Sequence, residues 1–305
     1  MGGRLEGKVA VITGTGDGIG RAGAMRFAKE GARIVGCDVT AQAAAETVRL
    51  VREAGGEMDC LCPLDLSDEA QAHRLMAHAV DVFGGIDVLY NNASSLRLGS
   101  AVDMKLEDWS FTLTHALTTQ WLATKHAIPH LKRRGGGSII FTSSTAGDNV
   151  GTGFAGNLPI LAAYSVAKAG VNRLATLCAI ELTRHNIRVN TVSPAWIDVP
   201  ATKEVYGEPG SASYEAVTRT MLVDRLGRPE EVAEAVVFLA SGAVPFMVGA
   251  NIRVDGGHFP GGGVGTPDPS VAGLFASATD SAVSVDNGWS GALISGGNRA
   301  EPPRA

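Results

Sequence analysis

The feature that most constrains the fold is a glycine-rich turn between a short apolar run and a helical stretch. The apolar run covers residues 8–13 (KVAVIT), the turn reads TGTGDGIG over residues 13–20, and a helical stretch follows over residues 21–30. Glycine permits the tight reversal, and the first amides of a helix carry a partial positive charge. A tight strand-to-helix turn needs glycine in any case. In this context, however, the turn also predicts an anion-binding site.

The same alternation of short apolar runs and longer helical stretches continues along the chain. Further strands are expected at residues 33–37, 58–62, 87–91, 138–142, 188–192 and 251–254. Helices are expected between them, at residues 41–54, 67–83, 106–134, 161–185 and 229–240. This order predicts an α/β fold, with a parallel sheet of about seven strands covered by helices on both faces.

The composition changes sharply near residue 257. No linker-like break occurs before it, so residues 1–257 are expected to form a single domain. Residues 258–305 are rich in Gly, Ser and Pro and are expected to form a C-terminal extension. A flexible tail is the simpler interpretation. Because the extension contains apolar residues such as Phe275 and Trp289, an arm docked on a neighbouring subunit is the alternative.

Charge and cysteine content exclude several functional classes. The net charge of −5 gives no basic footprint for nucleic acid, and no apolar run approaches the ~20 residues of a membrane span. The N-terminus lacks the apolar segment of a signal peptide. The four cysteines, none in a C-x-x-C pair, are Cys37, Cys60, Cys62 and Cys178. We therefore expect buried free thiols, no metal site and a cytoplasmic location.

An acidic residue after the second strand points to the ligand of the turn. Asp38 follows Gly20 by 18 residues, where a carboxylate can accept both adenosine ribose hydroxyls and repel a 2′-phosphate. Asp17 adds a second acid, and no Lys or Arg lies between Gly14 and Gly20. These residues favour NAD over NADP, with Arg33 the one base of concern. The alternative role for Asp38 is to cap the next helix, although Thr40 is available for that.

Several ordered motifs resemble those of the short-chain dehydrogenase/reductase family over residues 7–257. They are Thr13–Gly20, Asp65-Leu66, Asn91-Asn92-Ala93-Ser94, Ser143-Ser144, Tyr164-Ser165-Val166-Ala167-Lys168, Asn190 with Pro194-Ala195-Trp196-Ile197, Arg228-Pro229-Glu230-Glu231-Val232-Ala233 and Asp255-Gly256-Gly257. The resemblance implies a Rossmann-type fold, a nicotinamide cofactor and hydride transfer between an alcohol carbon and that cofactor. It also implies a homo-oligomer, a tetramer or a dimer.

The expected chemistry needs a base for the alcohol proton. Tyr164 and Lys168 are four residues apart and share a helix face. A nearby ammonium and the positive ring of the oxidised cofactor would favour the phenolate of Tyr164, whose reference pKa is ~10. Ser144 would hydrogen-bond the substrate oxygen. Strand alternation places Ser143 on the opposite face. An ordinary helix face is the alternative for the Tyr-x-x-x-Lys spacing.

The resemblance also assigns cofactor contacts by position. Asp65 would accept from the adenine amino group beside the Leu66 amide, and the backbone of Ile197 would meet the carboxamide. The complete set of expected cofactor contacts is Gly14, Asp17, Gly18, Ile19, Gly20, Asp38, Asp65, Leu66, Asn92, Ala93, Tyr164, Lys168 and Ile197.

The chain departs from the family pattern around the expected reaction centre. Ala116 replaces the asparagine of the family's catalytic tetrad, and no asparagine lies between Asn92 and Asn149. His115 could take part of that role, but a helix-surface histidine is the simpler interpretation. An insert lies within residues 148–159. Ala195 and Val199 stand where the family prefers glycine and threonine.

The pocket residues favour a neutral, moderately apolar alcohol or ketone as substrate. Candidates to line the substrate pocket are Ser94, Ser95, Leu96, Phe154, Leu158, Trp196 and residues 200–221, which form no fixed cation cluster. Two other functions stay open: an epimerase or dehydratase on the same fold, or an NAD-binding sensor that has lost turnover.

Overall fold

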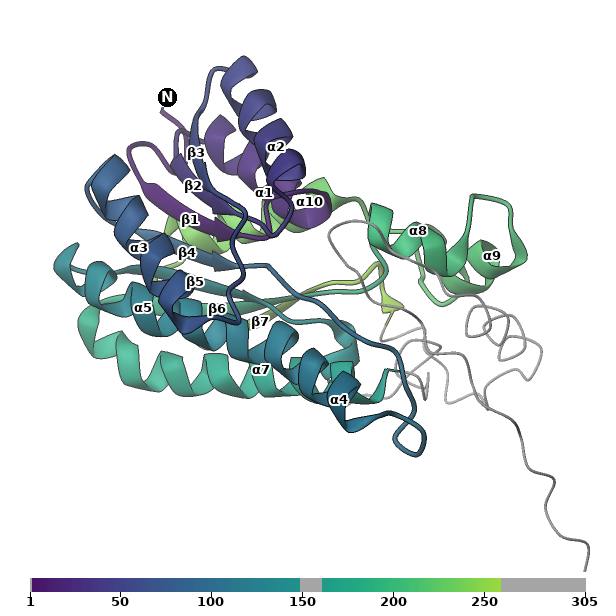
Figure 1. The fold of residues 1–305 in the computed structure, drawn as a ribbon. Helices are drawn as coiled ribbons and strands as arrows, with labels where there is room; N and C mark the ends of the chain where they lie inside the picture. Colours follow the sequence, from purple (N-terminus) through teal and green to yellow (C-terminus); the bar gives the residue numbers. More distant parts are fainter. Residues whose placement is uncertain (1, 149–160, 259–305) are drawn as a thin grey trace, which may run out of the picture.

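The sheet has seven parallel strands in the order β3-β2-β1-β4-β5-β6-β7 (Figure 1). The computed structural model describes residues 2–148 and 161–258. In chain order the strands are β1 (Val9–Thr13), β2 (Arg33–Cys37), β3 (Glu57–Leu61), β4 (Val88–Asn91), β5 (Gly137–Thr142), β6 (Ile187–Pro194) and β7 (Asn251–Val254). The sequence-predicted α/β fold with a seven-stranded parallel sheet is therefore confirmed.

Helices cover both faces of this sheet. One face carries α3 (Glu69–Phe83), α5 (Thr119–Arg133) and α7 (Ala162–Leu182), which enclose one apolar core with the sheet. The other face carries α1 (Gly18–Lys29), α2 (Ala41–Glu53) and α10 (Pro229–Ser241) around a second core (Figure 1). Because both faces are buried, the central strands are continuous apolar runs such as Val9–Thr13.

Two regions differ from the sequence-based expectation. The helix expected at 106–134 consists of α4 (Leu106–Leu113), a π-helical turn (Thr114–Thr118) and α5. The segment 200–221 was expected to cover the substrate as a loop, but it contains α8 (Pro200–Tyr206) and α9 (Ala212–Thr218). These two short helices enclose a small core of their own with Tyr206 and Met221.

Smaller differences concern the ends of elements. The helix expected to begin at Ser67 begins at Glu69, because the Asp68 carboxylate accepts from the Ala70 amide at 2.8 Å. The strand expected to end at Cys62 ends at Leu61. The first helix starts at Gly18 rather than at residue 21, so the glycine turn itself forms the helix N-terminus.

The topology places a crevice at the carboxyl ends of β1 and β4. These strands are neighbours, yet the chain leaves them in opposite directions across the sheet, toward β2 from β1 and toward β5 from β4. Ligands of open α/β sheets bind at such a switch point. The glycine turn and the segment after β4 both begin there.

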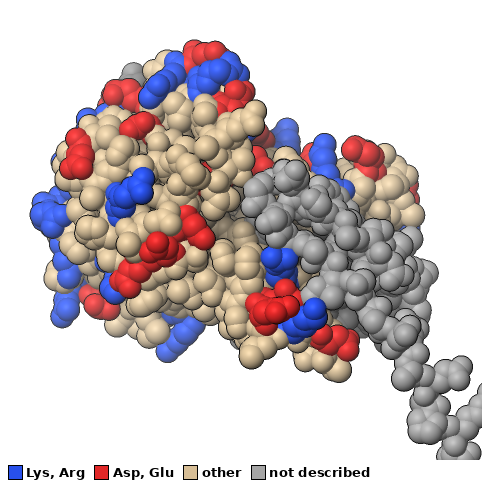
Figure 2. All heavy atoms as spheres, viewed as in Figure 1, with Lys and Arg blue, Asp and Glu red and all other residues tan. Residues whose placement is uncertain are grey.

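The surface charge, the helices and the thiols bear on the classes considered above, and the thiols require one correction. On the face drawn in Figure 2, basic and acidic residues are interspersed. Among the described residues no helix is long and apolar enough to cross a membrane. All four cysteines are free as expected, but only Cys37 is fully buried; the other three are partly exposed, and Cys60 Sγ lies 3.1 Å from Cys62 Sγ.

Candidate active site

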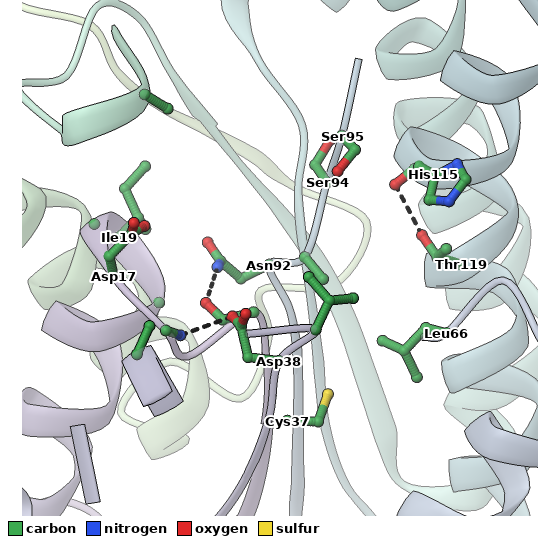
Figure 3. A pocket seen from close by; sticks show the side chains of 18 of the residues that line it. Asp17, Ile19, Cys37, Asp38, Leu66, Asn92, Ser94, Ser95, His115 and Thr119 are labelled. Carbon is green, nitrogen blue, oxygen red and sulfur yellow. Dashed lines mark hydrogen bonds between the residues drawn. The ribbon is translucent and has the colours of Figure 1, made fainter. Parts of the chain in front are cut away.

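A pocket of about 310 Å³ lies at the predicted switch point (Figure 3). Its walls come from the segments that follow the first four strands, from the π-helical turn and the start of α5, and from Val199 and Ala201 after β6. Of the expected cofactor contacts, ten line it: Gly14, Asp17, Gly18, Ile19, Gly20, Asp38, Asp65, Leu66, Asn92 and Ala93. Tyr164, Lys168 and Ile197 do not line it.

The glycine turn is shaped by contacts that a larger residue would block. Gly14 has φ +70°, and a Cβ there would lie 2.9 Å from the Cα of Ala93. A Cβ on Gly20 would collide with the Gly14 carbonyl. Gly16 falls between the glycines of the predicted G-x-x-x-G-x-G spacing, yet a Cβ there would come within 2.8 Å of the Asp38 carboxylate. The sequence therefore identified the turn but missed Gly16 as the contact to β2.

Asp38 holds the turn and lines the pocket at the same time. Its Oδ2 accepts from the Gly16 amide at 2.8 Å, and its Oδ1 accepts from the Thr40 amide at 2.9 Å. The second bond is a local turn before α2 and not a helix cap, because the N-cap residue is Thr40 and α2 has no side-chain cap. The Asp38 side chain thus holds the backbone on both sides of it and also lines the pocket.

The charges around this end of the pocket are acidic. Burial, followed by repulsion from Asp38, raises the pKa of Asp17, while Arg21 acts in the opposite direction. The Arg21 side chain is used to brace the turn: its guanidinium donates to the Gly16 carbonyl and to the Thr47 hydroxyl. Arg33 lies at the other end of β2, over the ring of Phe83. Neither arginine lines the pocket.

The ends of β3 and β4 are fixed by side-chain to backbone hydrogen bonds. The Thr13 hydroxyl accepts from the amides of Asn92 and Ala93 at 2.9 and 3.0 Å. The side-chain nitrogen of Asn92, Nδ2, donates to the backbone carbonyls of Thr13 and Gly14. Asp65 accepts from the Ser67 amide at 2.8 Å. The bonds of Thr13 and Asn92 tie the carboxyl ends of β1 and β4 together, and the bond of Asp65 fixes the local turn after β3.

The segment after β5 places Ser144 beside Tyr164 and Lys168 of α7. The Lys168 Nζ lies 5.4 Å from the centre of the Tyr164 ring, and Ser144 hydrogen-bonds the Tyr164 side chain. The Ser143 hydroxyl instead donates to the Lys168 carbonyl at 2.9 Å. The two serines therefore point to opposite sides, as strand alternation predicted.

Burial affects the two titratable groups of this cluster in opposite directions. It raises the pKa of Tyr164 to about 12, against the hydrogen bond from Ser144. It lowers the pKa of Lys168 to about 7. Both shifts favour the neutral form. In the protein alone Tyr164 is therefore neutral. The expected phenolate depends also on the positive ring of an oxidised cofactor and stays a prediction.

The expected backbone contact at Ile197 is partly occupied by the protein. Its carbonyl accepts from the Thr202 hydroxyl at 2.7 Å and the Tyr206 hydroxyl at 2.9 Å. Only the Ile197 amide is left for a ligand. Val199, which replaces the expected threonine, lines the pocket and donates its amide to the Thr202 hydroxyl at 3.3 Å. Thr202, the threonine three residues later in α8, was not among the expected contacts.

The helix opposite Lys168 contains the departures noted in the sequence. Ala116 is fully buried within the π-helical turn. His115 is not a plain surface residue: it lines the pocket, stacks on Phe111 with ring centres 4.0 Å apart, and shares a hydrogen bond with the Phe111 carbonyl. One turn beyond Ala116, the buried amide of Gln120 binds the Ala116 carbonyl at 3.2 Å. The prediction from sequence considered only asparagine and His115 at this place and did not include this glutamine.

Only part of the expected substrate wall is formed as predicted. Ser94 and Ser95 line the pocket. Tyr206 and Met221 are instead buried in the core of α8 and α9, and Trp196 packs edge-to-face on Tyr206. Phe154 and Leu158 lie outside the described residues.

Comparison with known proteins identifies relatives along most of the chain. The family model described as "Enoyl-(Acyl carrier protein) reductase" matches residues 14–258. A 3-oxoacyl-[acyl-carrier-protein] reductase, FabG, from Thermotoga maritima is 36% identical over 254 residues, covering 83% of this chain and 98% of that protein. A cis-4-hydroxycyclohexanecarboxylate dehydrogenase from Sinomonas cyclohexanicum is 38% identical over 259 residues, 85% of this chain and 99% of that protein.

A solved structure agrees with these relatives in fold. A short-chain dehydrogenase/reductase from Burkholderia xenovorans superposes with a TM-score of 0.76 at 33% identity, covering 84% of this chain and 98% of that one. Fold, motif order and relatives together show that this chain belongs to the short-chain dehydrogenase/reductase family, whose members are oxidoreductases that bind NAD or NADP.

Proposed function

We propose that this protein is an NAD-dependent dehydrogenase that interconverts a secondary alcohol and a ketone. The observation that carries the proposal is the cluster of Ser144, Tyr164 and Lys168, with Lys168 Nζ 5.4 Å from the Tyr164 ring, in a chain of this family. A protein that had lost turnover would have no need to keep a buried lysine beside a buried tyrosine.

The residues of the dinucleotide pocket fit such a cofactor. The turn is open only because Gly14 and Gly16 lack a Cβ, and the first amides of α1 face an anion favourably. The Ser94 hydroxyl lines the pocket and is buried without a hydrogen-bond partner, as a group reserved for a ligand would be. Asp65, Leu66, Asn92 and Ala93 would line the adenosine side, and the amide of Ile197 would meet the carboxamide.

The preference for NAD over NADP rests on the acidic end of the pocket. Asp38 and Asp17 would lie near the adenosine ribose, where a 2′-phosphate would meet two carboxylates. Arg21 and Arg33 are committed to other contacts and do not line the pocket.

The chain's own groups would then divide the chemistry as follows. Tyr164 takes the proton of the alcohol hydroxyl, while Ser144 hydrogen-bonds the same oxygen and stabilises charge that develops there. Lys168 provides the positive charge that favours phenolate on Tyr164. When bound, the oxidised dinucleotide supplies the hydride acceptor and a second positive charge. In the direction of reduction, Tyr164 returns the proton.

A neutral, moderately apolar alcohol or ketone suits the substrate side. Ser94, Ser95 and His115 line the pocket, and within residues 2–148 and 161–258 no Lys or Arg does so. The two named relatives are named for a 3-oxoacyl-[acyl-carrier-protein] and for cis-4-hydroxycyclohexanecarboxylate, which carry the expected ketone and alcohol; the second also carries a carboxylate. A homo-oligomer is part of the proposal, supported by apolar side chains exposed along α7, such as Leu177 and Ile180.

A turnover screen tests this function. The protein is incubated with NAD or NADP and a panel of secondary cyclic, terpenoid, steroid-like and aryl alcohols, and both reduced dinucleotide and ketone are measured. We expect reduced NAD and ketone in equal amounts with at least one alcohol. Binding without turnover would favour a sensor, and product without net change of the dinucleotide would favour an epimerase or a dehydratase.

A further inference from the structure

Gln120 is a buried glutamine in the first turn of α5, with 1% of its surface exposed. Its Nε2 donates two hydrogen bonds of 3.2 Å, to the carbonyls of Ala116 and Thr142. Both partners can only accept, which fixes the orientation of the carboxamide: the NH₂ group faces the carbonyls and Oε1 faces away from them.

The Thr142 carbonyl is shared between Gln120 and Lys168. Lys168 Nζ donates to this oxygen at 2.9 Å, and Gln120 Nε2 donates to it at 3.2 Å. A carbonyl oxygen has two lone pairs, so both are used. The position of the lysine ammonium is therefore set by a carbonyl that the glutamine holds from the other side.

The remaining polar atom of Gln120 is unused. Oε1 is buried and has no hydrogen-bond partner. A buried acceptor without a partner costs ~1–3 kcal/mol, and such groups in native proteins call for a specific reason. Lys168, which shares the Thr142 carbonyl with Gln120, has donors to spare: its ammonium has three N–H groups, and within the described residues one acceptor for them, the Thr142 carbonyl.

We propose that Gln120 is a positioning residue for Lys168. Its Nε2 fixes the Thr142 carbonyl that holds the lysine, and its Oε1 is a second acceptor for the Lys168 ammonium through one water. This inference rests on the proposed function, in which Lys168 must be charged beside Tyr164. It explains how the chain supports its lysine from the helix that carries Ala116.

The surroundings of Lys168 make such an acceptor consequential. The lysine is 1% exposed, and burial is the cause that lowers its pKa to about 7. On its own helix it lies beside Tyr164. From β5 it meets the Thr142 carbonyl, and that carbonyl also accepts from the neutral Gln120 amide of α5. No salt bridge to Lys168 occurs within residues 2–148 and 161–258. A neutral acceptor is thus the means available to α5 for stabilising the ammonium.

The test measures the pKa of Lys168 directly, in the full-length protein without dinucleotide or substrate. Lysine carbons next to the amine are labelled for NMR, and the Lys168 signal is identified by its loss in Lys168→Met. We expect Gln120→Met, which keeps length but removes the acceptor, to lower this pKa by about one unit, a tenfold change in the protonation equilibrium. Gln120→Glu should raise it, because a carboxylate attracts the ammonium.

A matched control separates positioning from packing. Asn91 is a buried amide at the end of β4 that donates to Thr124 of α5 at 2.9 Å and also has an unpartnered side-chain oxygen, but it shows no bond to Thr142 or Lys168. Asn91→Leu should leave the Lys168 pKa unchanged. In turnover assays, Gln120→Met should lose about tenfold in kcat with the KM for the alcohol within threefold.

An unchanged Lys168 pKa in both Gln120 variants would overturn the proposal, as would an equal shift in Asn91→Leu. If Gln120→Met fails to fold, Gln120→Glu decides by the sign of its shift. Because the NMR readout needs no turnover, it stands apart from the proposed function: an inactive wild-type protein would refute the dehydrogenase, whereas a constant lysine pKa would refute the role of Gln120.

Discussion

The two halves of the cleft are built from different parts of the polypeptide. The dinucleotide half is mostly main chain: glycines whose Cβ atoms would clash, amides at the start of α1, and strand ends tied by Thr13 and Asn92. The reaction half, to which we assign the proposed chemistry, is made of side chains, Ser144, Tyr164, Lys168 and Gln120, which come from the segment after β5, from α7 and from α5. The first half binds through shape, and the second depends on buried polar groups.

Because of this difference, the two halves should respond differently to substitution. A main-chain cradle tolerates few residue types, because a single Cβ changes its shape. A cluster of buried side chains instead carries shifted pKa values and costs stability. Substitutions in one half should therefore change binding while substitutions in the other change rate.

The largest expected effect is the loss of turnover in Tyr164→Phe. The ring still packs, and only the hydroxyl that exchanges the proton is removed. We expect turnover to fall by ~10²–10⁴-fold, with the dissociation constant for NADH within a few-fold of wild type, measured by fluorescence titration. A variant that retains more than a third of the wild-type rate would place the acid/base group elsewhere.

The dinucleotide half should show its own selectivity. We expect NAD to be preferred over NADP by at least ~1.4 kcal/mol, about tenfold in kcat/KM. Asp38→Ala should reduce this preference for NAD. Gly16→Ala should reduce it less, since its Cβ would press on the Asp38 carboxylate at 2.8 Å.

Gly55→Ala serves as the control for Asp38→Ala and Gly16→Ala. Gly55 has φ +82° with nothing within 4 Å of a Cβ, so the change adds backbone strain without touching the pocket. Its NAD to NADP ratio should equal that of wild type. Equal use of the two dinucleotides by the wild-type protein, or a preference for NADP, would refute the role assigned to Asp38.

These halves also differ in how far the sequence predicts them. The turn at residues 13–20 and Asp38 are local signals, and ten of the predicted contacts line one pocket. The spacing of Tyr164 and Lys168 is local as well. Gln120, by contrast, acts through the carbonyl of Thr142, 22 residues away, and through a π-helical turn. Such contacts depend on tertiary packing.

The same reason explains the errors around residues 200–221. Tyr206 and Met221 were expected at the substrate because they are apolar in a covering segment. They are buried because α8 and α9 form a small core, which no periodicity in such short helices indicates. The contact of Tyr206 with the Ile197 carbonyl follows from that packing.

A smaller effect concerns pH and stability in the reaction half. The folded-state pKa of Lys168 is lowered to about 7, so between that value and its ordinary range near 10.5 the unfolded chain binds the extra proton. The free energy of unfolding should therefore rise with pH across this window. Lys168→Met lacks this pH dependence, so we expect it to be more stable than the wild type at low pH. The difference in free energy of unfolding between the two proteins should shrink by about 2 kcal/mol between pH 6 and 9.

Denaturant unfolding at several pH values measures this. A gap between Lys168→Met and wild type that stays constant with pH would mean that the lysine is charged in the folded protein at all these values, and the reaction half would not carry the expected cost.

The smallest expected effect concerns the predicted C-terminal extension. His258, the first residue beyond the predicted domain boundary, is 1% exposed and its amide donates to the Asp255 carbonyl at 3.0 Å. Truncation after His258 should leave NAD binding unchanged and alter oligomer stability or substrate KM modestly, measured by light scattering and steady-state kinetics. Insoluble or unfolded protein would place the extension in the core domain.

The most direct test of the whole account follows one atom across the cleft. A secondary alcohol that the protein oxidises is prepared with deuterium on the carbinol carbon and incubated with NAD, and the reduced dinucleotide is examined by mass spectrometry. The account predicts one deuterium in each reduced dinucleotide and no such product from Tyr164→Phe. Deuterium released to water, or ketone formed without labelled dinucleotide, would contradict it.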